Sequence, residues 1–125
     1  MRSMRDADIT KGAITISKYG NRKTEVNGLL FDSRHEANRW IELTYLERAK
    51  MIRDLQRQVP FELIPKQTDE KGRVKERAVK YVADFVYSDR NGNLVVEDAK
   101  GMRTDSYKLK KKMMRYFKGI EIIEV

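Results

Sequence analysis

The sequence of 125 residues has no cysteine, a single histidine and two prolines. Without cysteine the chain cannot form disulfide bonds, zinc–thiolate sites or a thiol nucleophile. One histidine excludes metal sites built from several histidines and argues against a Ser-His-Asp triad. No apolar run approaches the roughly 18 residues of a membrane span, and the start of the chain lacks the apolar core of a signal peptide. We therefore expect a cytoplasmic protein with no membrane partner.

Positive charge is concentrated in two stretches of the chain. There are 27 Lys and Arg against 19 Asp and Glu, a net charge of +8. Residues 99–118 hold eight basic side chains and one acidic side chain, and residues 1–24 hold six and two. Clustered lysines and arginines bind the nucleic-acid backbone by releasing its counterions. Residues 99–118 are therefore predicted to form a phosphate-contacting surface.

The length fits one domain, which we place at residues 19–125 behind a flexible basic arm at residues 1–18. Asn27-Gly28 is a favoured type I′ turn and predicts a hairpin over residues 23–31. Ser33 and Glu36 have the spacing of a capping box and predict a helix that runs to about Lys50.

Three strands are expected next, at residues 57–64, 78–87 and 94–100. Residues 66–77 form an exposed turn or the tips of a long hairpin, and residues 88–93 are short enough to make the last two strands antiparallel. A helix from Thr104 to about Phe117 and a strand over residues 120–125 follow. The predicted fold is α/β, a mixed sheet of order α-β-β-β-α-β flanked by helices.

The predicted helix after Thr104 carries two stripes. Its apolar stripe is formed by Leu109, Met113, Tyr116 and Phe117. Its basic stripe, which we expect to contact nucleic acid, is formed by Lys108, Lys111, Lys112 and Arg115.

An acidic pair indicates the chemistry. The hairpin of the last two long strands can be closed in a register that places Asp84 directly opposite Asp98, with Cβ atoms ~4.5–5.5 Å apart. Two like charges there are destabilising unless a cation lies between them, and oxygen ligands favour Mg²⁺ or Mn²⁺. Lys100 follows on the same face, where it can hold a water or a phosphate oxygen.

The alternative is that the two aspartates are ordinary solvent-facing residues of a one-sided sheet. Their neighbours on that face argue against it, because all are apolar and are expected to be buried: Val82, Val86, Leu94 and Val96. Glu97 is expected on the opposite face, outside the metal site.

Two further residues have two interpretations each. Glu36 is either the capping-box partner of Ser33 or a third carboxylate aimed at the sheet, and both roles are compatible. Gln58 either orients a water or a phosphate, or is simply a polar residue at the start of a strand.

These residues resemble the PD-(D/E)XK nuclease superfamily. The pattern comprises Glu36 on the first helix, Ala83-Asp84 in one strand, Asp98-Ala99-Lys100 in the next and a basic helix after Gly101. Ala83 stands where the motif has proline, which supplies no ligand. Over residues 19–125 the chain is more closely similar to small phage and prophage nucleases linked to Holliday-junction resolution in DNA recombination.

The resemblance implies roles for individual residues. Asp84 and Asp98 would bind Mg²⁺, with Mn²⁺ as a substitute, and Glu36 and the backbone carbonyl of Ala99 would complete the set. Lys100 would position the attacking water or steady the charge of the phosphorane. Four residues would meet the DNA backbone near the scissile phosphate: Thr104, Tyr107, Lys108 and Lys111.

The expected function is a Mg²⁺-dependent, structure-selective endonuclease that acts as a homodimer on four-way DNA junctions, in the host cytoplasm if the chain is phage-encoded. A two-fold symmetric substrate requires two equivalent sites. The alternatives are a nicking or flap endonuclease of phage replication or packaging, and a nucleic-acid-binding module without catalysis.

Overall fold

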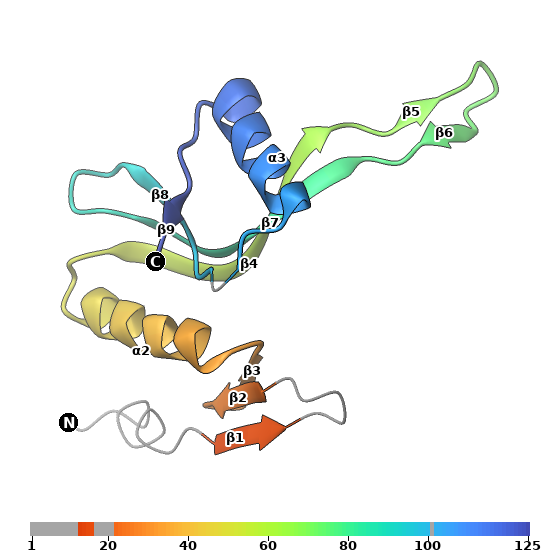
Figure 1. The fold of residues 1–125 in the computed structure, drawn as a ribbon. Helices are drawn as coiled ribbons and strands as arrows, with labels where there is room; N and C mark the ends of the chain where they lie inside the picture. Colours follow the sequence, from red (N-terminus) through yellow and green to blue (C-terminus); the bar gives the residue numbers. More distant parts are fainter. Residues whose placement is uncertain (1–12, 17–21, 101) are drawn as a thin grey trace. The chain divides into compact units, whose positions relative to one another are not determined.

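The computed structural model describes residues 13–16, 22–100 and 102–125, which are drawn in colour in Figure 1. Contacts divide the chain into two compact units, residues 1–50 and residues 51–125. Residues 13–16 of the predicted arm form a strand, and the rest of the arm lies outside the described residues. The single domain expected over residues 19–125 stays a prediction, and each unit is described by itself.

The first unit contains a three-stranded antiparallel sheet of order β1-β2-β3, with β1 at Ala13–Ile16, β2 at Arg22–Val26 and β3 at Leu29–Phe31. The expected hairpin is confirmed, since Val26 pairs with Leu29. Asn27 and Gly28 between them have φ angles of 54° and 79°. A type I′ turn requires positive φ at both central residues, which explains this pair in the sequence.

Helix α2 at Arg34–Arg48 follows this sheet. Ser33 is its N-cap, and its hydroxyl accepts the N–H of Glu36 at 3.1 Å, so the predicted helix start is confirmed. Trp40 lies against Phe31 with ring centroids 6.2 Å apart. The helix ends at Arg48, close to the predicted end at Lys50. The Phe31–Trp40 pair packs the helix on the sheet of the first unit.

The second unit is built on a four-stranded mixed sheet of order β4-β7-β8-β9. The strands are β4 at Arg53–Ile64, β7 at Val79–Ser88, β8 at Leu94–Asp98 and β9 at Ile123–Glu124. The first three are antiparallel neighbours, and β8 and β9 are parallel. The mixed sheet is thus as predicted, although β4 begins four residues earlier than expected.

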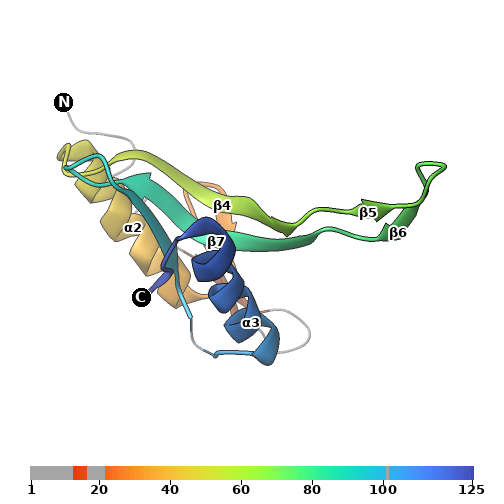
Figure 2. The same ribbon diagram turned by 90° about the horizontal axis from the view of Figure 1, so that it is seen from above.

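The segment between β4 and β7 continues these strands as a hairpin, with β5 at Gln67–Thr68 and β6 at Val74–Glu76. Figure 2 shows β4 and β7 running on into it. At its tip the Asp69 carboxylate accepts the N–H groups of Lys71 and Arg73, each at 2.9 Å. Of the two interpretations of residues 66–77, the long hairpin is the one observed.

Helix α3 at Asp105–Met113 continues into the π-helical turn η1 at Met114–Lys118 and covers one face of this sheet. The core between them is formed by Leu63, Tyr81, Ala83, Val86, Val96, Tyr107, Met114 and Ile122. Gly119, with φ of 66°, ends the helix as expected. None of the helices in the described part of the chain has the length and apolarity that crossing a membrane would require.

The apolar stripe predicted for this helix is wrong in three of its four members, and only Met113 packs against the core. Leu109, Tyr116 and Phe117 are exposed, while the buried side chains are Tyr107 and Met114. A π-helical turn contains more residues than an α-helical one, so η1 changes the angular position of the residues that follow Met113. The last two members of the stripe therefore face away from the sheet.

The predicted burial of Val82 and Leu94 is also wrong, since they are 47% and 54% exposed. On β7, Ala83 and Val86 both belong to the core, although a regular strand would point them to opposite faces. The alternation therefore changes between these two residues. Leu94 is the first residue of β8, at the edge of the core.

Candidate functional site

The two aspartates lie where β7 and β8 separate. The ladder pairs Phe85 with Glu97 and continues to Ser88 and Leu94, in the register predicted from the sequence. The ladder ends one residue short of Asp84 and Asp98. Instead, Asp84 Oδ2 accepts the backbone N–H of Ala99 at 2.9 Å. The Asp84 carboxylate therefore contacts the residue that follows Asp98.

Asp98 is 1% exposed, and its two carboxylate oxygens differ. Oδ2 accepts the hydroxyl hydrogen of Tyr81 at 2.5 Å. Oδ1 is buried and accepts no hydrogen bond from the described residues. The Lys100 ammonium lies 3.2 Å from Oδ1, at ion-pair distance but without hydrogen-bond geometry. A buried carboxylate oxygen without a hydrogen bond is costly in free energy, so Oδ1 has an unused capacity to bind a ligand.

Asp84 is oriented from the other side by Gln58, whose amide Nε2 donates to Asp84 Oδ1 at 3.3 Å. The β4–β7 ladder pairs Arg57 with Phe85 and Val59 with Ala83. It does not include Gln58 and Asp84, which lie between these two pairs. Gln58 has a φ of 55°, a left-handed conformation that is unusual within a strand. Such irregularities re-aim side chains next to functional sites.

Gln58 therefore lies in the interior of β4, because that strand begins at Arg53. Its interpretation as a residue at the start of a strand is wrong. Its role toward a water or a phosphate stays a prediction.

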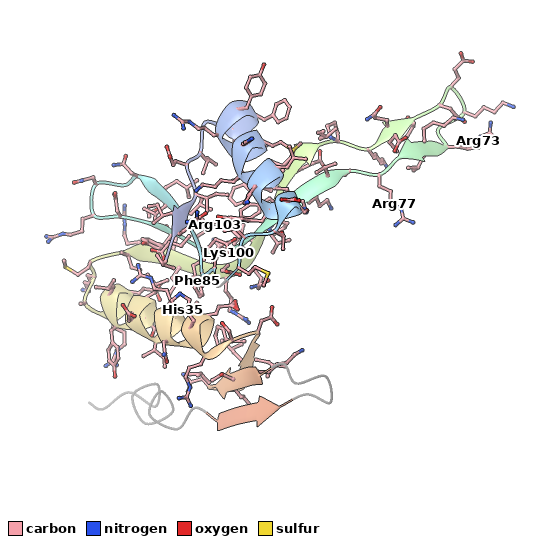
Figure 3. All side chains as sticks on the ribbon, in the orientation of Figure 1. His35, Arg73, Arg77, Phe85, Lys100 and Arg103 are labelled. Carbon is pink, nitrogen blue, oxygen red and sulfur yellow. The ribbon has the colours of Figure 1, made fainter. Side chains whose placement is uncertain are left out.

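Lys100 is held between an acid and a ring. Its Nζ lies 4.5 Å from the centroid of the Tyr107 ring, a cation–π contact, besides its ion pair with Asp98. Figure 3 shows Lys100 and Arg103 on the segment that joins β8 to α3. The Lys100 side chain is 30% exposed, so its ammonium can still meet a ligand.

Two functional groups were missed by the sequence interpretation. Tyr81 was assigned to the core, where it lies, but its hydroxyl also bonds Asp98. Burial, followed by the hydrogen bond to Asp98, raises the pKa of Tyr81, which keeps it a neutral donor. Regular alternation would have placed Tyr81 on the face opposite the aspartates, so no signal in the sequence pointed to this contact.

The second missed residue is Glu124 of β9, whose register partner on β8 is Asp98. Its carboxylate accepts hydrogen bonds from Tyr107 Oη at 2.8 Å and Lys111 Nζ at 3.0 Å, and it pairs with Arg103. These contacts hold the pKa of Glu124 below its ordinary value, the hydrogen bond from Tyr107 being the largest cause. Glu124 therefore fixes α3 to the sheet beside the acidic pair.

The predicted nucleic-acid contacts fall into two groups. Lys108, Lys112 and Arg115 are exposed on the helix. Thr104 is also exposed but serves as the N-cap of α3, since its Oγ1 accepts the N–H of Tyr107 at 3.1 Å. Tyr107 and Lys111 are engaged with Glu124, as described above. Burial and the bond to Glu124 raise the pKa of Tyr107.

Two further carboxylates remain to be placed: Glu36, a predicted ligand, and Glu97, which was expected to lie outside the metal site. Glu36 is buried in α2 of the first unit, and its approach to the aspartates stays a prediction. The Glu97 carboxylate accepts the hydroxyl hydrogen of Tyr87, and the Glu97 backbone is paired with Phe85 in the ladder. These partners differ from those of Asp98. Within the residues that the structure describes, no group of three or more acidic or histidine side chains is close enough to hold a metal ion.

The second unit nevertheless provides oxygen ligands that suit Mg²⁺. Asp84 and Asp98 supply carboxylate oxygens, which this ion prefers, from neighbouring strands. Asp98 Oδ1 is buried and lacks a hydrogen bond, and a cation would satisfy it. The acidic pair therefore fits a divalent cation that completes its coordination with water and with substrate oxygens.

Comparison with known proteins gave one match. The model of a family described as a protein of unknown function, DUF1064, matches residues 16–122. The chain belongs to the DUF1064 family. The part matched to DUF1064 contains Glu36, Gln58, the aspartate pair and the whole of α3, whereas Glu124 lies just beyond it. No curated protein and no solved structure matches the chain.

Proposed function

We propose that this chain is a Mg²⁺-dependent DNA endonuclease of the PD-(D/E)XK type that acts on four-way junctions. The proposal depends chiefly on Asp98, a buried carboxylate with one oxygen bonded to Tyr81 and the other without a hydrogen bond among the described residues. Asp84 reaches the backbone of the next residue, Ala99. Two acids at the end of a strand pair can hold the metal ion that assists phosphodiester hydrolysis, and a lysine beside them can stabilise the charge that develops on the phosphate.

Asp84 and Asp98 would hold the ion, together with the carbonyl of Ala99 and, if it approaches, Glu36. When bound, Mg²⁺ neutralises charge on the phosphate oxygens and lowers the pKa of a bound water. Mn²⁺ would substitute for it, because it accepts the same oxygen ligands.

The surrounding residues orient these groups. Tyr81 fixes the Asp98 carboxylate through Oδ2, and Gln58 fixes that of Asp84 through Oδ1. Lys100, held over the Tyr107 ring, has its ammonium beside Asp98, where it would position the attacking water or stabilise the charge that develops on the phosphate.

Selectivity for DNA shape is supported by the character of the basic surface. Lys108, Lys112 and Arg115 are exposed on the helix that follows Asp98 and Lys100 in the sequence. Contacts of such side chains with phosphates position the nucleic acid but carry little sequence information. A four-way junction has approximate two-fold symmetry, and paired cuts in it require two equivalent sites, so we propose a homodimer.

The test uses a labelled four-way junction and a linear duplex of the same sequence, each with Mg²⁺ or with EDTA. We expect Mg²⁺-dependent cuts in the junction and little cutting of the duplex. Equal cutting of both substrates would contradict the junction selectivity, and no cutting of any DNA with Mg²⁺ or Mn²⁺ would contradict the endonuclease. Light scattering of the protein–junction complex tests the dimer, which one bound chain per junction would contradict.

A pair of variants separates catalysis from binding. Asp84→Asn should abolish cleavage while DNA binding is kept or tightened, because one repulsive charge is removed. Glu121→Gln makes the same change of charge at an exposed position. Glu121→Gln should cleave as the wild type does. Cleavage by Asp84→Asn at the wild-type rate would favour a binding module whose acidic pair has no catalytic role.

A further inference from the structure

A pocket opens between the start of β7 and the first turns of α3, in the second unit. It is lined by Lys80, Tyr81, Val82, Lys100, Thr104, Ser106, Tyr107 and Lys110. Among the residues that the structure describes, all three charged side chains in this lining are lysines, and no aspartate or glutamate contributes to it. We call it the lysine pocket. Its composition favours an anion, because Lys80 and Lys110 add two positive charges to that of Lys100, which is paired with Asp98, and an anion would offset their repulsion.

The lysines come from separate parts of the chain. Lys80 belongs to β7, Lys110 to α3, and Lys100 to the segment between β8 and α3. Their convergence is therefore a product of the fold, whereas the lysine run 110–112 is visible in the sequence. Lys80 lies outside the stretch that the sequence predicted to contact phosphates, and Lys110 lies within that stretch but outside the predicted basic stripe of the helix.

Hydroxyl groups add donors to the cavity. Thr104 Oγ1 accepts the N–H of Tyr107, so its own hydroxyl hydrogen is available to a ligand. Ser106 contributes a second hydroxyl, also in the first turn of α3. Two hydroxyl donors and three ammonium groups match the several acceptor oxygens of a phosphate.

The lysine pocket adjoins the acidic pair. Two of its lining residues, Tyr81 and Lys100, are the two that contact the Asp98 carboxylate. A phosphate in the lysine pocket and a phosphate at Asp98 would therefore be near neighbours, as successive phosphates of one strand are.

We propose that the lysine pocket binds a phosphodiester next to the scissile one in the same DNA strand, and that Lys80 and Lys110 are positioning residues for the cut. This rests on the proposed endonuclease function. Lys80 and Lys110 would hold the strand in register with the acidic pair. Their loss would weaken substrate binding and raise KM, while kcat, which depends on the acidic pair, changes little.

The experiment measures binding to junctions that carry a single neutral methylphosphonate, scanned through the phosphates of one strand around the branch point. Binding is measured in EDTA, so it does not depend on cleavage. The test variant is Lys80→Gln/Lys110→Gln. The control is Lys71→Gln/Lys75→Gln, which removes the same charge from exposed positions of the β5–β6 hairpin. Thermal unfolding establishes that both double variants are folded.

With the wild type and the control, we expect one methylphosphonate position to weaken binding by about tenfold, the loss of one charge-assisted hydrogen-bond set. In Lys80→Gln/Lys110→Gln, a methylphosphonate at that position should no longer weaken binding, because the two lysines that contact the phosphate have been removed. Where the wild type cleaves, the sensitive position should be adjacent to the cut. The KM of Lys80→Gln/Lys110→Gln should be about tenfold higher than that of the wild type.

The results separate the two proposals. If the test variant shows the same sensitive position as the wild type, or if the wild type has none, the lysine pocket does not bind a DNA phosphate, whether or not the protein cleaves. If the wild type never cleaves but the sensitive position disappears in the test variant, the endonuclease fails and the lysine pocket remains a phosphate site.

Discussion

Replacing Tyr81 by phenylalanine removes one hydroxyl from the acidic pair and leaves the packing of the ring intact. That hydroxyl donates at 2.5 Å to Oδ2 of Asp98, which is 1% exposed and has no hydrogen bond from the described residues on its other oxygen. A hydrogen bond to a charged group contributes about 1.5–3 kcal/mol. The free energy of unfolding should therefore fall by about 2 kcal/mol in Tyr81→Phe.

The corresponding change in Tm follows from the size of the protein. With an unfolding entropy of about 2.1 cal/mol/K per residue over 125 residues, 1 kcal/mol corresponds to about 4 °C. Thermal unfolding in EDTA should therefore show a Tm lower by about 8 °C. Tyr116→Phe is the control, because Tyr116 is 84% exposed and should lose almost nothing. Equal Tm values for the two variants would refute the argument that Tyr81 supports the buried carboxylate.

Three further predictions concern the same unit. The pKa of Glu124 lies below its ordinary value of 4.5. The stabilisation from the ionised Glu124 carboxylate is therefore complete above pH 4.5 and is lost as the pH falls through the pKa of the folded state. Denaturant unfolding should show Glu124→Gln to be less stable than the wild type at pH 7, and the difference should narrow toward pH 3. Met114→Ala should cost about 2–5 kcal/mol in chemical unfolding, and Leu109→Ala, at an exposed site of the same helix, less than about 0.5 kcal/mol. Gln58→Gly should relieve a strain of about 1 kcal/mol while slowing cleavage, because Asp84 loses a hydrogen-bond donor.

Features that depend on local chemistry were predictable from the sequence. Certain residue types are strongly preferred at turns and at helix ends. They correctly indicated the turn at Asn27-Gly28, the helix N-caps Ser33 and Thr104, and the helix end at Gly119. The register of β7 and β8 followed from the short turn between the strands, which permits few ways of closing the hairpin.

Features that depend on departures from regular geometry were not predictable. The left-handed φ of Gln58 and the change of alternation between Ala83 and Val86 have no counterpart in a period-2 pattern. Val82 was therefore misplaced, and the contact of Tyr81 with Asp98 was missed. In the same way, the π-helical turn η1 turned Tyr116 away from the sheet, where a 3.6-residue period had placed it.

The acidic site was predictable in part. Its central residues, Asp84, Asp98 and Lys100, were identified from strand alternation and spacing, and the structure joins them through Ala99 and the Lys100 ion pair. Glu124 was not identified, because its contacts depend on the parallel return of β9, which links residues far apart in sequence.

The central claim, that Asp84 and Asp98 together hold a divalent cation, is tested most directly by titrating the protein with Mn²⁺ and measuring the bound ion by electron paramagnetic resonance. We predict saturable binding to the wild type and to Glu121→Gln, and its loss in both Asp84→Asn and Asp98→Asn. Undiminished binding in the two aspartate variants, or no saturable binding in the wild type, would contradict the claim.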